Sequence, residues 1–118
     1  MNNKVAIYIR YNKPTEEIQL EELLNYVKEN NLDLYKVYTD ICSGIIPNPP
    51  ELTNLIRNSH NFNSLLVYSV DRISRNYKYF YDVKTKLFNS NVNIISLKEG
   101  AVIWELQHTP GSLPITSV

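Results

Sequence analysis

The 118-residue sequence has few of the residues that build several common kinds of site. It contains one cysteine, Cys42, which excludes an intrachain disulfide. Its two histidines, His60 and His108, are too few for the ligand sets of structural zinc sites. Its three glycines do not have the spacing of a GxGxxG turn or a GxxxxGK[ST] loop. We therefore expect no metal site and no nucleotide-binding loop of these two types.

Long apolar runs are also missing. No run reaches the roughly 18 residues that a membrane-spanning helix needs, and the MNNK start lacks the apolar core of a signal peptide. A composition of 43% hydrophobic and 20% charged residues is typical of a globular protein, and the length suits one compact domain. These features predict a soluble cytoplasmic protein that does not associate with a membrane.

The net charge is zero, which by itself argues against a nucleic-acid-binding protein. The charge is unevenly distributed, however. Residues 1–55 have five basic and eight acidic side chains, a net charge of −3, whereas residues 56–98 have seven basic and two acidic ones, a net charge of +5. The basic stretch suits a local phosphate site, and the alternative is an ordinary solvated helix face.

Apolar runs of strand length alternate with stretches of helical periodicity. The runs at residues 5–9, 34–38, 64–68 and 91–97 predict strands, and the spacing of apolar residues predicts helices over 16–29, 51–58 and 71–88. This alternation predicts an α/β fold, a three-layer sandwich with a mainly parallel sheet of four to five strands. We expect one domain over residues 1–104 and a weakly ordered tail over 105–118, where chain-breaking residues replace the pattern.

Ligands of open parallel sheets bind beyond the carboxyl ends of the strands. The polar side chains that follow the first three predicted strands are Arg10, Asn12, Asp40, Ser43, Ser69, Asp71 and Arg72. Arg75 comes three residues after Arg72, so the two guanidinium groups are expected on one helix face. Three arginines at one edge suit a phosphate or phosphodiester, although each arginine alone is more often a surface side chain.

Other α/β chemistries fit these residues poorly. A receiver-type phosphoacceptor needs clustered carboxylates, and the first strand supplies Arg10 instead. No Ser-His-Asp or Cys-His arrangement is expected, because His60 follows the second predicted helix and His108 lies in the tail. Cys42 fits the role of a small buried apolar side chain better than that of a reactive thiol.

Four segments together resemble the catalytic domain of serine recombinases, the resolvase, invertase and large serine integrase group. YIR at residues 8–10 resembles the family's Y-x-R, and YTDICSG at 38–44 resembles its Y-x-D-x-x-S-G. DRISR at 71–75 is similar to its D-R-L-S-R, and NVNIISL at 91–97 to its final core strand. Gln19 matches a family glutamine. The resemblance covers residues 3–100 and implies a resolvase-like (flavodoxin-like) topology.

The resemblance implies DNA strand cleavage and exchange without metal or cofactor. In the family a serine hydroxyl attacks a backbone phosphate, leaving a 5′-phosphoserine link and a free 3′-hydroxyl. Arg10, Arg72 and Arg75 correspond to residues that stabilise the charge on phosphorus. Asp71 would orient an arginine, and the implied supporting residues are Gln19, Asp40 and Ser43.

The sequence departs from the family at the nucleophile. Asn12 stands where the family has its serine, and an amide does not attack phosphate. Ser43 and Thr15 are nearby hydroxyls, but nothing in the family's geometry places them for attack. Pro49 replaces an arginine that the family commonly has before its short helix. We therefore expect this chain to be inactive alone.

The end of the sequence also departs from the family. Pro110 and Pro114 stand where the family begins a long dimerisation helix that leads to its DNA-reading region. We expect either a catalytic domain separated from a longer protein or a naturally shortened one. Three functions remain open: a recombinase catalytic domain, a pseudo-recombinase that binds DNA or a partner within a homo- or hetero-oligomer of recombinase-like chains, and a flavodoxin-like small-molecule binder.

Overall fold

The computed structural model describes residues 3–11, 18–42, 48–99 and 102–104. The strands are β1 (Lys4–Tyr11), β2 (Asp33–Ile41), β3 (Ser64–Val67), β4 (Asn93–Ser96) and β5 (Val102–Trp104). The helices are α1 (Ile18–Glu29), α2 (Pro50–Arg57) and α3 (Tyr77–Asn89), with short 3₁₀ turns η2 (Ser59–Asn61) and η3 (Val70–Arg72). The predicted alternation of strands and helices is confirmed.

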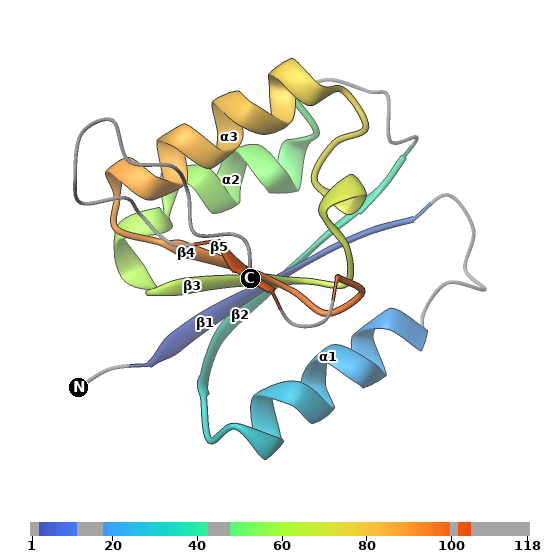
Figure 1. Ribbon diagram of the computed structural model, residues 1–118, viewed down its shortest axis with the longest axis vertical. Helices are drawn as coiled ribbons and strands as arrows, with labels where there is room; N and C mark the ends of the chain where they lie inside the picture. The colour runs from blue at the N-terminus through green and yellow to red at the C-terminus, as the bar shows by residue number, and fades with distance from the viewer. Residues whose placement is uncertain (1–2, 12–17, 43–47, 100–101, 105–118) are drawn as a thin grey trace.

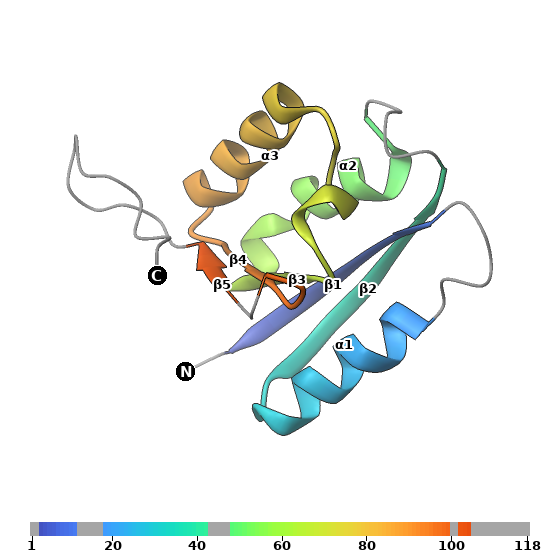
Figure 2. The ribbon, with the colours of Figure 1, turned by 45° about the vertical axis from the view of Figure 1, so that its right-hand side comes forward.

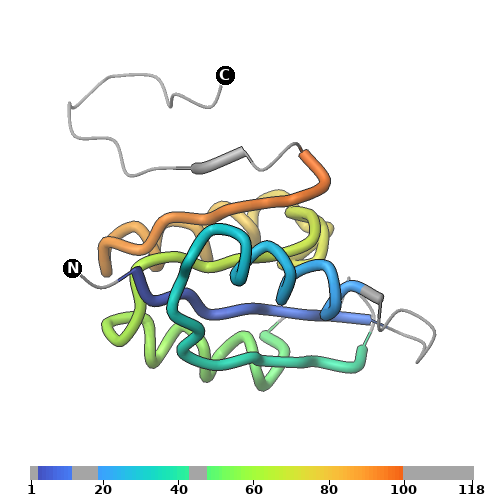
Figure 3. The backbone as a smooth tube through the Cα atoms, turned by 90° about the horizontal axis from the view of Figure 1, so that it is seen from below, coloured from blue at the N-terminus to red at the C-terminus, as the bar shows by residue number. Residues whose placement is uncertain are grey.

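The strands form one sheet in the order β2-β1-β3-β4-β5 (Figure 1). The first four strands are parallel, and β5 pairs antiparallel with β4 at one edge. Figure 2 shows α1 on one side of the sheet and α2 with α3 on the other. Figure 3 shows β1 lying between β2 and β3. The expected three-layer α/β sandwich with a mainly parallel sheet is therefore the observed fold.

The core has two halves because successive side chains of a strand point to opposite faces of the sheet. In β1, Ala6 and Tyr8 face α2 and α3, whereas Val5, Ile7 and Ile9 face α1. All five side chains are buried, which explains why this strand reads as a continuous apolar run. By the same alternation, the even-numbered residues at the end of β1 lie on the same face of the sheet as Tyr8, the face that α2 covers.

The predicted helix over 71–88 begins later than expected. Asp71 and Arg72 belong to η3, and α3 starts at Tyr77. The Asn76 side chain accepts a hydrogen bond from the Tyr79 backbone N–H at 3.1 Å, which caps the helix at this point. Buried Ile73 anchors the preceding turn in the core. Arg72 and Arg75 therefore do not share a helix face, and that prediction was wrong.

Two further expectations concern the end of the chain and membrane-spanning helices. Residues 105–118, the expected tail, lie outside the described residues, so the domain boundary at 104 stays a prediction. In the portion of the chain that the structure describes, none of the helices has the length and apolar character required to cross a membrane.

Candidate functional site

The carboxyl ends of β1, β2 and β3 lie side by side, at the point where the strand order reverses. We call this end of the sheet its carboxyl-end edge. The chain leaves β1 for β2 on one side and later returns to β3 on the other. Arg10 pairs in register with Asp40 of β2, and Arg72 lies in η3, just after β3. This edge is where open α/β sheets place their ligands. The structure thus brings Arg10, Asp40 and Arg72 together.

A direct contact joins two of the three predicted phosphate-binding arginines. Arg72 Nη1 donates a hydrogen bond to the backbone carbonyl oxygen of Arg10 at 3.3 Å. The Arg10 side chain is only 2% exposed, whereas Arg72 is half-buried and Arg75 is exposed. The edge therefore has one positive charge in the interior, one near the surface and one in solvent.

Asp40 acts as a cap for a neighbouring helix. Its Oδ1 accepts from the Glu51 backbone N–H and its Oδ2 from the Leu52 backbone N–H, both at 3.0 Å. These amides belong to the first turn of α2, where no helical carbonyl is available to them. The residue at the N-cap position is Pro49, whose side chain makes no capping hydrogen bond. A buried carboxylate on β2 thus replaces the usual local cap and fixes the start of α2.

Tyr8 is the third group bound to Asp40. The Tyr8 hydroxyl donates to Asp40 Oδ2 at 2.6 Å, and the tyrosine is fully buried. Burial raises the pKa of Tyr8 far above its ordinary value, and the hydrogen bond to Asp40 raises it further, against an opposing effect of Arg10. Tyr8 therefore stays neutral in the folded protein and remains a hydrogen-bond donor.

The Tyr8→Phe variant should change how stability depends on alkaline pH. Unfolded Tyr8 loses its proton above its ordinary pKa of 10.0, whereas the folded protein keeps that proton. The unfolded state then binds fewer protons, so Tyr8 makes the free energy of unfolding fall by about 1.4 kcal/mol per pH unit above 10. Urea denaturation between pH 9 and 11 should give a shallower fall for Tyr8→Phe than for wild type. Parallel curves would contradict this assignment.

Of the remaining predicted site residues, the structure describes Asp71 and Gln19. Asp71 is exposed, and its carboxylate accepts a hydrogen bond from the buried Ser69 hydroxyl. Gln19 is buried in the first turn of α1. Asn12 and Ser43, like Thr15, lie outside the described residues. Their roles in the site stay predictions.

Cys42 differs from its expected role as a buried apolar side chain. It is a free cysteine of intermediate exposure, at the bend that directly follows β2. The preceding residue, Ile41, is 66% exposed. Ile41 lies on the α1 face of the sheet, together with Val37, so the packed core on that face ends before the end of β2.

Tyr8 and Ser69 also contribute to this edge, although the sequence pointed to Tyr8 only as part of the YIR segment and to Ser69 only as one of the polar residues after the third strand. Tyr8 binds Asp40, and Ser69 binds Asp71. Tyr8 precedes Arg10 by two residues, and Tyr38 precedes Asp40 by two, so all four side chains belong to one face of the sheet. That spacing was a usable signal for Tyr8.

Within the described residues, no group of three or more His, Cys, Asp or Glu side chains could hold a metal ion.

Comparisons with known proteins agree with this geometry. The family described as "Resolvase, N terminal domain" matches residues 5–116. The N-terminal catalytic domain of TP901-1 integrase has a TM-score of 0.76 and 31% sequence identity, over 85% of this chain and 80% of that one. A comparison with curated proteins finds no match.

Two more distant structures share the fold. The C-terminal catalytic domain of ISC1926 TnpA, an IS607-like serine recombinase, has a TM-score of 0.73 and 22% identity, over 80% of this chain and 69% of that one. A resolvase family site-specific recombinase from Streptococcus pneumoniae has a TM-score of 0.70 and 16% identity, over 82% and 73%. The chain therefore belongs to the resolvase N-terminal domain family and has the fold of a serine recombinase catalytic domain.

Proposed function

We propose that this chain is the catalytic domain of a site-specific DNA recombinase, and that its arginines bind a DNA backbone phosphate at the carboxyl-end edge of the sheet. The observation that supports this most directly is the contact between Arg72 Nη1 and the Arg10 carbonyl oxygen. It places two cationic residues from distant parts of the sequence at one strand-end site. Membership of the resolvase family supports DNA as the source of the phosphate.

The different burial of the three arginines suggests a different role for each of them in phosphate binding. Arg72 and Arg75 reach the surface and would donate to the phosphate oxygens, while buried Arg10 would add its positive charge from beneath. Asp40 would hold the start of α2 beside the site through its capping hydrogen bonds. Gln19, Ser43 and Asp71 would support the site from adjacent elements, and the proposal requires no metal or cofactor.

Asn12 limits what this site would do. Its side-chain amide cannot replace a serine hydroxyl as nucleophile, so the chain would bind a phosphate without forming a covalent link to it. This residue favours a second candidate function, a pseudo-recombinase. Such a protein would act as a regulatory or binding module, on DNA or within a homo- or hetero-oligomer of recombinase-like chains.

The Arg75→Ala variant tests the phosphate site. Arg75 is exposed, so its loss should leave the fold intact while removing one phosphate contact. We expect the affinity for a random-sequence DNA duplex to fall roughly tenfold and the salt dependence of binding to lose about one unit of slope. Fluorescence anisotropy of a labelled duplex, measured over a series of salt concentrations, gives both quantities.

Arg57→Ala is the matched control. Arg57 is also exposed and carries the same charge, but it lies in the last turn of α2, which runs back toward the opposite edge of the sheet. Its loss should change duplex affinity by less than about twofold, as expected for a surface charge away from the contact. Equal effects of the two variants would mean that DNA binds through overall charge only, and the proposed phosphate site would be wrong.

A further inference from the structure

Two tyrosines on the first turns of α3 are exposed to an unusual degree for aromatic side chains. Tyr77 is 78% exposed and Tyr81 is 55% exposed, and one helical turn separates them. Together with Lys78 they line a shallow hollow of about 260 Å³. We call Tyr77, Lys78 and Tyr81 the tyrosine patch. Neither ring belongs to the two clusters of the described core.

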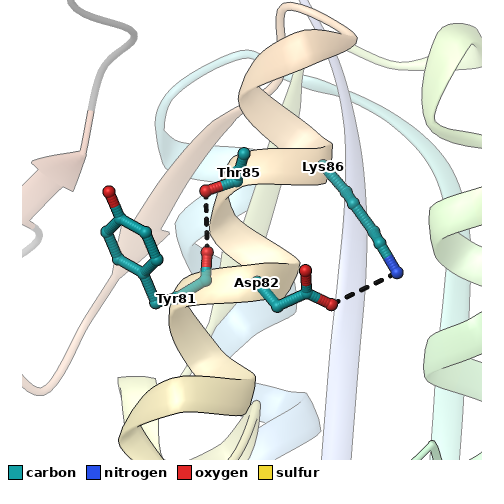
Figure 4. Close-up of polar contacts among 4 residues, drawn as sticks. All are labelled: Tyr81, Asp82, Thr85 and Lys86. Carbon is teal, nitrogen blue, oxygen red and sulfur yellow. Dashed lines mark hydrogen bonds and ion pairs between the residues drawn. The ribbon is translucent and has the colours of Figure 1, made fainter.

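The surroundings of the tyrosine patch are cationic. Lys84 Nζ lies 5.1 Å from the centre of the Tyr81 ring. The nearest acidic residue along the helix, Asp82, forms an ion pair with Lys86 at 3.2 Å. Figure 4 shows this pair on the side of α3 away from the Tyr81 ring. The patch therefore presents aromatic faces beside lysine ammonium groups, and the carboxylate of Asp82, the residue after Tyr81, is paired with a lysine.

The patch is also continuous with the arginine site. The start of α3 follows β3 and η3, the turn that contains Arg72, and Figure 1 shows it at the same side of the sheet as the carboxyl ends of β1 and β2. Exposed Arg75 lies two residues before Tyr77 and links the two surfaces. A ligand with phosphates at regular intervals could therefore occupy both.

We propose that the tyrosine patch binds unpaired DNA, with one or two bases stacked on Tyr77 and Tyr81 and an adjoining phosphate bound by Lys78. Every base has a π face, so tyrosine rings flanked by cations suit single strands of any sequence. In duplex DNA both faces of a base are already stacked on its neighbours, so the patch should favour single strands. The inference rests on the proposed function, and it adds a preference that the arginine site alone does not supply.

The experiment compares two variants of Tyr81 on a labelled 12-nucleotide oligothymidylate. Tyr81→Leu keeps an apolar side chain but loses the ring, and we expect its affinity for the single strand to fall roughly 5- to 150-fold. Tyr81→Phe keeps the ring and should bind within about twofold of wild type. The Tyr81 side chain is exposed, so circular dichroism should show the same fold for wild type and both variants.

Several outcomes would overturn the inference. One is equal binding of the oligothymidylate by Tyr81→Leu and wild type, and another is no binding by wild type at 100 µM (an order-of-magnitude limit for a useful site). A third is a self-association, seen by analytical ultracentrifugation, that Tyr81→Leu abolishes without affecting DNA binding, because the patch would then be a protein interface. If Arg75→Ala still weakens duplex binding, the proposed function survives these results. If neither variant matters, both proposals fail.

Discussion

Replacing Asp40 by alanine should destabilise the protein by about 3–5 kcal/mol, the largest effect on stability that we expect from removing one polar side chain. The carboxylate accepts three hydrogen bonds, from the Glu51 and Leu52 amides and from the Tyr8 hydroxyl. Its loss uncaps α2, which costs about 0.5–2 kcal/mol, and leaves buried donors unsatisfied at about 1–3 kcal/mol each. Urea denaturation followed by far-UV circular dichroism measures the change.

Asp33→Ala is the matched control for this prediction. Asp33 begins the same strand that Asp40 nearly ends, but it is exposed, so its loss should change stability by no more than about 0.5 kcal/mol. Asp40→Asn, which keeps the shape and one acceptor oxygen, should fall between alanine and wild type. If Asp40→Ala cost less than about 1 kcal/mol, the carboxylate would not be the cap of α2.

Replacing Asn12 by serine should allow the chain to form a covalent link to DNA, a reaction that we expect it not to perform with asparagine at this position. A serine hydroxyl at this position would attack phosphorus and lose its proton, a new P–O bond to serine would form, and the P–O3′ bond would break as the 3′-hydroxyl takes up a proton. Removing a covalent nucleophile in a well-studied enzyme costs on the order of a millionfold in rate. Restoring one should therefore take the yield of adduct from undetectable to measurable.

The adduct can be measured without knowledge of the target sequence. The Asn12→Ser protein is incubated with a library of random-sequence duplexes, denatured, and examined by gel electrophoresis and intact mass for a protein–DNA species. Asn12→Ala is the control for the amide itself and should form no adduct. The double variant Asn12→Ser with Arg72→Ala should give far less adduct than Asn12→Ser, because it lacks a cation that we propose to stabilise the charge on the phosphate. A complete absence of adduct from Asn12→Ser would favour the pseudo-recombinase function over the catalytic one.

Much of the fold was predictable because local patterns encode it. The continuous apolar run that became β1 is buried on both faces, and its length and composition are those of a central parallel strand. The start of α3 was not predictable from periodicity alone. Phe80, Val83 and Leu87 set the helical face, but the Asn76 cap and the 3₁₀ turn at Val70–Arg72 determine where that helix begins.

The sequence by itself determined the α/β class, the strands whose ends carry Arg10, Asp40 and Arg72, and the family motifs, because each depends on residues close together in the chain. Only the tertiary structure decided what those side chains do. The Arg72 contact with the Arg10 carbonyl spans 62 residues, and the Tyr8 contact with Asp40 spans 32. Asp40 caps a helix that begins ten residues after it in the sequence, across a segment rich in proline. Such hydrogen bonds depend on the path of the whole chain, and no local pattern specifies that path.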